Sequence, residues 1–284
     1  MPRHLLLALA ILLLPLTQFP LQAQADQTPR FEPLGLFLFE LDGKVLPDAE
    51  IYYSGQIGAV LVLTPELPYP IAVVQRNQTL QRLVSSELIK DPAGFIAWSL
   101  PATKTAIGEI RLLEDNLPAF SVEGKQARFR TKPPLLGPAT LEDIVRYDPS
   151  YAYRARPYQP EPGYMSALAE VDTDTLVKIY FSTDCDVCRE LLPNIIKVAQ
   201  ELDNPNLRIE FFGLPLKASE HPVGREMNIT TFPTGIIYSD GVEVGRAHGH
   251  GWRFPSMAIH HGLSGIKVDV ETLLERPSAP PPPE

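Results

Sequence analysis

The sequence predicts a small β-rich domain followed by an α/β domain, in which helices flank a central mixed sheet. Short apolar runs separated by turn residues fill residues 26–131. Residues 166–276 instead alternate short apolar segments with longer helical patterns, and a linker rich in proline and tyrosine at residues 132–165 joins the two regions. A leader at residues 1–25 and a disordered Pro-rich tail at residues 277–284 complete the predicted organisation.

The leader has the three parts of a cleavable signal peptide. A short basic start precedes an apolar run at residues 5–16, and Ala23, Gln24 and Ala25 form the small-x-small pattern that signal peptidase recognises. The run is too short for a membrane-spanning helix of about 20 residues. We therefore expect export to the periplasm, an oxidising compartment.

The first predicted domain consists of short strands. Asp42-Gly43 and Glu123-Gly124 are hairpin signals. We expect one short helix at residues 80–88. Apolar or alternating runs predict strands at residues 36–41, 51–53, 59–63, 71–74, 95–100, 110–113, 120–122 and 127–129. Because this region contains neither Cys nor His, we expect the chemistry of the protein to lie elsewhere.

The linker is predicted to be semi-rigid. Seven prolines and five tyrosines fall within residues 131–164, and proline restricts the backbone to extended conformations. A short helix can begin at Thr140, whose hydroxyl can cap it, and Asp143 suits the first turn. We expect the tyrosines to pack the linker against a neighbouring domain; a peptide-docking surface is the alternative.

The second predicted domain has the element order β, α, β, α, β, β, α. Apolar residues recur three and four apart after Cys188, which predicts a long amphipathic helix. Asp240-Gly241 predicts a hairpin near the end of the domain. The strands are expected at residues 176–181, 207–214, 234–238 and 242–246, with further helices at 223–227 and from Pro255 onward.

The two cysteines of the chain, Cys185 and Cys188, follow the first strand of this domain. A disulfide between them would close a very small loop and would stabilise the fold little. A structural zinc site needs four ligands, and the chain has no second cysteine pair. The pair is therefore predicted to serve chemistry or to bind a metal in another way.

A Cys-x-x-Cys pair at the first strand-to-helix junction, in this order of elements, resembles the thioredoxin superfamily over residues 172–274. Pro193 lies where family members carry the proline that bends the active-site helix. Phe232, Pro233 and Thr234 open the third strand and are similar to the cis-proline segment of the family. The resemblance covers the C-terminal half of the chain and leaves the first domain outside.

The resemblance implies a redox-active disulfide, with Cys185 as the nucleophile and Cys188 as the resolving thiol. It also implies that Thr231, Phe232 and Pro233 border an extended substrate. The implied partners are protein disulfides or dithiols. Because the periplasm has no thiol buffer of its own, we expect a membrane thiol relay as electron source or sink. We expect no cofactor. Since 34 acidic residues outnumber 25 basic ones, we expect no nucleic acid partner either.

Several positions depart from the family pattern. Asp184 stands in place of the usual Trp, and Asp186-Val187 replaces Gly-Pro; both carboxylates oppose ionisation of the first cysteine. Ile179 occupies the position of the buried carboxylate, for which Glu210 is a candidate replacement. These changes favour a reductant or a specific exchanger over a strong oxidant.

A second interpretation is a non-catalytic thioredoxin-fold module that binds a protein partner or a soft metal. His248 and His250 lie in a histidine-rich stretch and could join the two cysteines around Cu or Zn. Solvated loop histidines are the more ordinary explanation, because their spacing is not that of a known metal site. The preferred prediction is therefore a thiol-disulfide oxidoreductase without a metal at its site.

Overall fold

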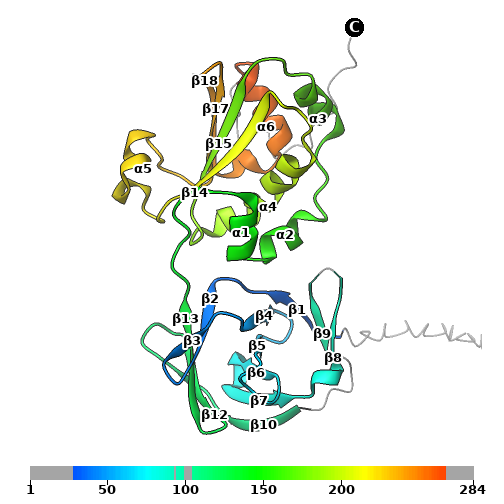
Figure 1. Cartoon of the computed structure of the whole chain (residues 1–284), viewed down its shortest axis with the longest axis vertical. Helices are drawn as coiled ribbons and strands as arrows, with labels where there is room; N and C mark the ends of the chain where they lie inside the picture. Colours follow the sequence, from blue (N-terminus) through cyan, green and yellow to red (C-terminus); the bar gives the residue numbers. More distant parts are fainter. Residues whose placement is uncertain (1–27, 93, 99–103, 267–284) are drawn as a thin grey trace, which may run out of the picture.

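The computed structural model describes residues 28–92, 94–98 and 104–266, and these form two bodies stacked along the long axis of the molecule (Figure 1). The predicted leader and the Pro-rich tail lie outside the described residues. Across the described ranges, no helix combines the length and the apolar character needed to cross a membrane.

The N-terminal body is built from antiparallel strands, as predicted. One sheet has the order β10-β7-β6-β5-β4-β1-β9-β8 and the other the order β11-β12-β13-β2-β3. The first comprises β1 (Arg30–Pro33), β4 (Glu50–Ser54), β5 (Ala59–Leu63), β6 (Ile71–Val74), β7 (Thr79–Leu83), β8 (Leu88–Lys90), β9 (Ile96–Trp98) and β10 (Lys104–Glu109). The second comprises β2 (Phe37–Leu41), β3 (Lys44–Leu46), β11 (Arg111–Leu112), β12 (Pro118–Val122) and β13 (Lys125–Thr131). Buried Phe39, Phe120 and Phe129 contact one another in the core of this domain.

The predicted helix at residues 80–88 is wrong. Its first half is β7, hydrogen-bonded between β6 and β10, and a short 3-10 turn at Ser85–Glu87 follows. Leu80 and Leu83 are buried there. Their three-residue spacing fits either a helix or an irregular strand, and the two neighbouring strands satisfy the backbone groups of β7.

Both predicted hairpin turns are confirmed. Asp42 and Gly43 connect β2 to β3, and Glu123 and Gly124 connect β12 to β13. All four residues have positive φ, between 49° and 79°. Turns of this kind match the right-handed twist of the strands that they join.

The C-terminal body contains the predicted α/β sheet, with one additional strand. Its order is β14-β16-β15-β17-β18, and β15 and β16 are parallel while the other pairs are antiparallel. The strands are β14 (Gly137–Ala139), β15 (Thr175–Phe181), β16 (Leu207–Gly213), β17 (Thr234–Ser239) and β18 (Val242–His248). The predicted helices are α4 (Asp186–Glu201), α5 (Pro222–Glu226) and α6 (Pro255–Leu263). The central strand β15 therefore ends just before the two cysteines.

The linker predicted at residues 132–165 is not an extended spacer. It contains β14, α1 (Leu141–Tyr147), α2 (Ser150–Ala155) and the start of α3 (Pro162–Ala169). Pro149 is the N-cap of α2 and Pro162 is in the first turn of α3. Proline is tolerated at helix starts because the N–H it lacks has no intrahelical partner there. The prolines thus mark where helices begin.

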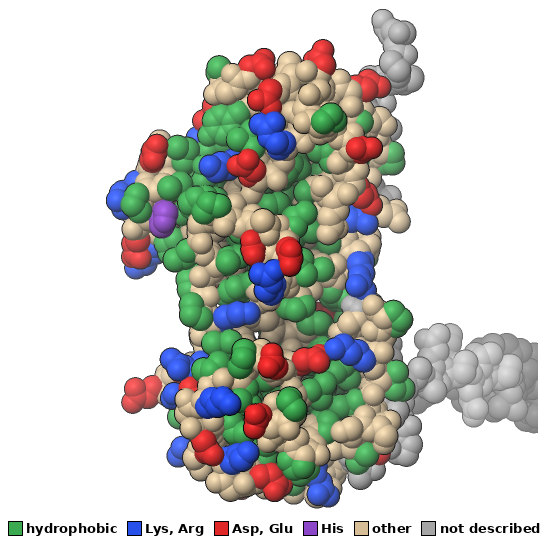
Figure 2. All heavy atoms as spheres, viewed as in Figure 1, with side chains coloured by type: hydrophobic (Ala, Val, Ile, Leu, Met, Phe, Trp, Pro, Cys, Tyr) green, Lys and Arg blue, Asp and Glu red, His purple; other side chains and the backbone are tan. Residues whose placement is uncertain are grey.

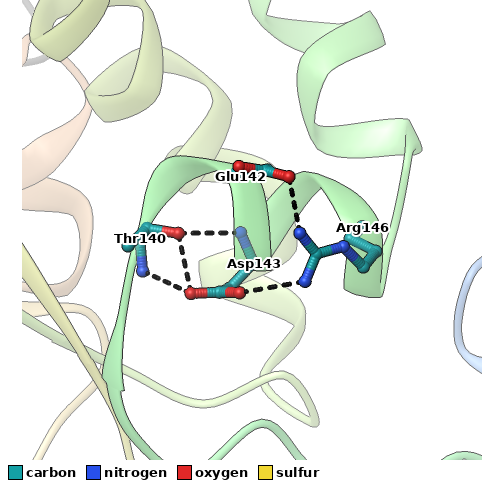
Figure 3. A network of polar contacts seen from close by, with 4 residues as sticks. All are labelled: Thr140, Glu142, Asp143 and Arg146. Atoms are coloured by element: carbon teal, nitrogen blue, oxygen red, sulfur yellow. Dashed lines mark hydrogen bonds and ion pairs between the residues drawn. The ribbon is translucent and has the colours of Figure 1, made fainter.

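The predicted cap at the start of α1 is confirmed (Figure 3). The Thr140 hydroxyl accepts the Asp143 N–H at 3.1 Å, and the Thr140 N–H donates to the Asp143 carboxylate at 3.0 Å. This reciprocal pair satisfies amides that the first turn leaves free. Arg146 forms ion pairs with Glu142 at 2.6 Å and with Asp143 at 3.3 Å, which ties the cap to the last turn of α1.

The corner between α1 and α2 rests on the N-terminal domain, and the two bodies meet there at a narrower waist (Figure 2). The Gly35 N–H donates to Asp148 Oδ1 at 3.2 Å, and Lys132 Nζ donates to the Tyr147 carbonyl at 2.7 Å. A Cβ at position 35 would overlap the Asp148 backbone and would lie 2.7 Å from the Tyr147 carbonyl oxygen. Only glycine therefore fits this contact.

We predict that Gly35→Ala loosens the junction between the domains. Overpacking of this kind typically costs about 1–3 kcal/mol, so the urea midpoint should fall and protease cleavage between the domains should become faster. Gly55→Ala is the matched control, because a Cβ there meets only the Tyr53 ring, at 3.7 Å. Equal stability and equal protease resistance in both variants would contradict the close contact.

Candidate active site

The two cysteines lie at the N-terminus of α4. Cys185 is the N-cap residue, with extended backbone angles of φ −98° and ψ 119°, and Cys188 lies in the first turn. The Cys185 sulfur accepts the Cys188 N–H at 3.2 Å, so it takes the place of the usual capping oxygen. This position favours a negative charge on the sulfur, because free amides and the helix dipole both face it.

The two thiols differ in exposure. Both are free; Cys185 is 9% exposed, whereas Cys188 is completely buried. Cys188 belongs to the hydrophobic core of the domain and contributes to the packing between α4 and the sheet. Cys185 is therefore the more accessible of the two sulfurs.

The same geometry separates the acidities of the two thiols. A hydrogen bond from the Cys188 thiol lowers the pKa of Cys185 to about 6, with help from the amides of Cys188 and Val187 and against the effect of burial. Burial, together with the bond to Cys185, raises the pKa of Cys188. At neutral pH the site therefore holds a thiolate beside a protonated thiol.

The flanking carboxylates do not reverse this arrangement. The charge of Asp186 raises the pKa of Cys185, as the sequence predicts, but it is outweighed by the hydrogen bonds to the sulfur. The Asp186 side chain is 92% exposed and pairs with Arg189 at 3.3 Å, so that water and a cation weaken its effect. The Asp184 carboxylate, also exposed, acts on Tyr147.

The predicted substrate-binding residues lie beside Cys185. The Phe232-Pro233 peptide bond is cis, and the Phe232 carbonyl oxygen is 4.0 Å from the Cys185 sulfur. Thr231 is exposed, whereas Phe232 and Pro233 are buried. The Gly249 N–H donates to the Pro233 carbonyl at 2.7 Å and fixes this loop against the end of β18. The fold thus brings the three residues to the cysteine pair, and their role in substrate binding stays a prediction.

The histidine-rich stretch does not join this site. His248 Nδ1 lies 3.0 Å from the Thr234 hydroxyl, and burial lowers the pKa of His248. Within the described ranges, no three His, Cys, Asp or Glu side chains lie close enough to bind one metal ion. The four-ligand combination of Cys185, Cys188, His248 and His250 is therefore not assembled.

The predicted replacement for the buried carboxylate is wrong. Ile179 is fully buried on β15, but Glu210 is exposed on β16, where its charge acts on Tyr180. Tyr151 of α2 is fully buried in the same core cluster as Cys188. The sequence predicts packing or peptide docking for this cluster of tyrosines and gives no sign that Tyr151 lies in the same core as Cys188.

Comparison with known proteins finds the thioredoxin family in the C-terminal half. The family model for thioredoxin matches residues 159–253. Mitochondrial thioredoxin 3 from Saccharomyces cerevisiae, in its oxidised form, is 22% identical over 36% of this chain and 87% of its own, with a TM-score of 0.25. Thioredoxin f2 from Chlamydomonas reinhardtii is 20% identical over 32% of this chain and 81% of its own, with a TM-score of 0.23. A search of curated proteins finds no match. The family match confirms the predicted fold class of this half of the chain.

We predict that Cys185 titrates near pH 6. The rate of iodoacetamide modification should reach half its maximum at about pH 6, because only the thiolate reacts. Asp186→Asn should move this midpoint to lower pH, since it removes the charge that opposes ionisation. Asp184→Asn is the control and should move it less. A midpoint near the ordinary thiol value of about 8.5 would contradict the site geometry.

Proposed function

Because the C-terminal half of the chain is a thioredoxin domain, we propose that the protein is a thiol-disulfide oxidoreductase acting on protein partners. Cys185 is the proposed nucleophile and Cys188 the proposed resolving thiol. The observation that carries this proposal is the pairing of a reachable, low-pKa thiolate with a buried thiol one helical turn away. Structural cysteines buried in apolar surroundings lack this asymmetry.

The exchange proceeds in two displacements. The Cys185 thiolate attacks one sulfur of a substrate disulfide, that bond breaks, and a mixed disulfide forms while one substrate sulfur leaves as a thiolate. Cys188 then loses its proton and attacks the Cys185 sulfur, which releases the second substrate thiolate. Two electrons pass to the substrate, and the protein is left with a disulfide between Cys185 and Cys188. A separate dithiol must reduce this bond before the next turnover.

The acidity of Cys185 supports the reducing direction. A pKa of about 6 lies closer to the thioredoxin value of about 7 than to the value of about 3.5 in a strongly oxidising thioredoxin-fold protein. The more a protein stabilises its thiolate, the more readily its disulfide is reduced and the stronger an oxidant it becomes. A moderate stabilisation therefore favours a reductant or a specific exchanger.

We further propose that the protein works in the periplasm, after its leader at residues 1–25 directs export and is removed. A membrane thiol relay would then supply or accept its electrons, because the periplasm has no thiol buffer of its own. The exposed edge at Thr231, next to Phe232 and Cys185, is the proposed contact for an extended segment of the partner protein.

We predict that Cys185→Ser abolishes reduction of a disulfide-bonded protein when dithiothreitol supplies the electrons. Cys188→Ser should keep the first displacement and accumulate a mixed disulfide, because the resolving thiol is missing. Non-reducing electrophoresis and turnover assays measure the two effects. Unchanged activity of Cys185→Ser, or stoichiometric metal binding without turnover, would instead support the non-catalytic module.

We also predict the reduction potential of the cysteine pair. Equilibration with dithiothreitol and glutathione buffers should give a value closer to about −270 mV than to about −120 mV, the values for a reducing and an oxidising member of the fold. Alkylation of the remaining thiols followed by mass spectrometry measures the oxidised fraction. A value near the oxidising limit would overturn the proposed direction of electron flow while leaving the exchange reaction intact.

A further inference from the structure

The two domains form a cavity between them that the cysteine chemistry does not use. Its volume is about 470 Å³, and it lies at the waist between the two bodies in Figure 2, where residues of both line it. The N-terminal domain contributes Leu34, Phe37 and Tyr52 among others, and α1 and α2 contribute Val145, Ala152 and Tyr153. Sites for small molecules are typically of this size, mostly apolar, and often located between domains. The cavity is therefore a candidate ligand site.

The charged residues that line this cavity are mostly basic. Lys90, Lys132, Arg146 and Arg156 are cations, and Glu50 is the one acidic residue among the lining residues that the structure describes. The protein as a whole carries a formal charge of −9, so this excess of positive charge is local. A concave site lined by one sign of charge attracts ligands of the opposite sign. The occupant that we expect is an anion.

Most of these cations already have partners in the protein. Lys90 pairs with Glu50 at 2.6 Å, and Arg146 pairs with two carboxylates of α1. The Arg156 side chain is exposed and donates to a backbone carbonyl at 3.5 Å. The cation that remains for a ligand inside the cavity is Lys132.

Lys132 is half-buried without a counter-ion. Its ammonium group donates to the Tyr147 carbonyl at 2.7 Å and lies 4.6 Å from the centre of the Tyr147 ring. Over the described ranges it forms no ion pair with a carboxylate; Asp148 acts on it only at longer range, and Asp148 Oδ1 accepts the N–H groups of Gly35 and Ser150. An ammonium group has three donors, and a partly buried charge without a partner is costly. An anion in the cavity would supply the missing partner.

We propose that this cavity binds a small organic anion, with its carboxylate accepting a hydrogen bond from Lys132 and its apolar body packed between the domains. The rings of Tyr52, Tyr147 and Tyr153 line the cavity and suit a flat, aromatic body. Such a ligand contacts both domains at once and therefore holds their junction together. The inference goes beyond the proposed disulfide exchange, because neither cysteine lines the cavity.

The test compares 2-naphthoate, an aromatic carboxylate, with its uncharged amide, 2-naphthamide. Calorimetric titration of the full chain should show one 2-naphthoate bound per chain, and the amide should bind about tenfold or more weakly, since hydrogen bonds between charged groups are the strong ones. Lys132→Met should weaken 2-naphthoate binding to a similar extent, whereas Lys132→Arg should keep most of it. Lys44→Met is the matched control, because Lys44 is exposed on β3 and does not line the cavity.

A second pair of variants tests the space in the cavity and leaves its charge unchanged. Ala152→Leu fills the cavity from α2 and should weaken 2-naphthoate binding, whereas Ala169→Leu, at the exposed end of α3, should not. Bound 2-naphthoate should also slow protease cleavage between the domains of the wild-type protein and of Lys44→Met, but not of Lys132→Met. If Lys132→Met fails to fold, the amide and Ala152→Leu still decide the outcome.

The two proposals can fail separately. Absence of 2-naphthoate binding to the wild-type protein, equal binding of the amide, or equal affinity in Lys132→Met and Lys44→Met would overturn the anion site. Disulfide reduction should be the same in Lys132→Met and in the wild-type protein, so each of those results would leave the oxidoreductase function standing. A wild-type protein that binds 2-naphthoate but reduces no disulfide would overturn the proposed function and support the anion site.

Discussion

The chemistry of this protein depends on how the Cys185 sulfur is held at the start of α4. It accepts the Cys188 N–H at 3.2 Å, at the point where the buried strand β15 gives way to the helix. That one contact stabilises the negative charge of the first sulfur. Because the Cys188 thiol also donates to Cys185, the same arrangement opposes ionisation of the second sulfur. The helix start therefore gives two chemically identical side chains different acidities, as the proposed roles of nucleophile and resolving thiol require.

The segment that precedes the matched thioredoxin region connects the two domains to this site. Strand β14 extends the sheet, and α2 packs against α4 in the core that contains Cys188. Asp148, at the corner of these helices, accepts the Gly35 N–H of the N-terminal domain, and Tyr151 lies one helical turn further on. The corner between α1 and α2 thus contacts the N-terminal domain on its outer side and the core around Cys188 on its inner side.

Much of this architecture could be predicted from local patterns. The strands and helices of the α/β domain follow from hydrophobic periodicity, and the hairpins follow from their Gly-containing turns. The helix predicted at residues 80–88 is wrong because a short apolar run does not distinguish helix from strand. The extended linker is wrong because prolines at helix starts look like prolines of an extended chain. The prediction that Glu210 replaces a carboxylate at Ile179 is wrong because of strand register. Glu210 pairs with Lys178, whereas Ile179 pairs with Phe211, and successive residues of a strand point to opposite faces. Only the paired strands show which residues share a face.

Ile179, at the position where the thioredoxin resemblance implies a buried carboxylate, is fully buried and offers Cys188 no group that takes up a proton. A carboxylate that accepts the thiol proton becomes a neutral acid, so its charge no longer opposes the thiolate next to it. A tyrosine hydroxyl with a pKa raised by burial, such as that of Tyr151, does not accept that proton. In the proposed exchange, the proton of Cys188 would leave through the substrate sulfur that is released first. Under that proposal, resolution would follow engagement of a partner, which suits an exchanger that acts on specific disulfides.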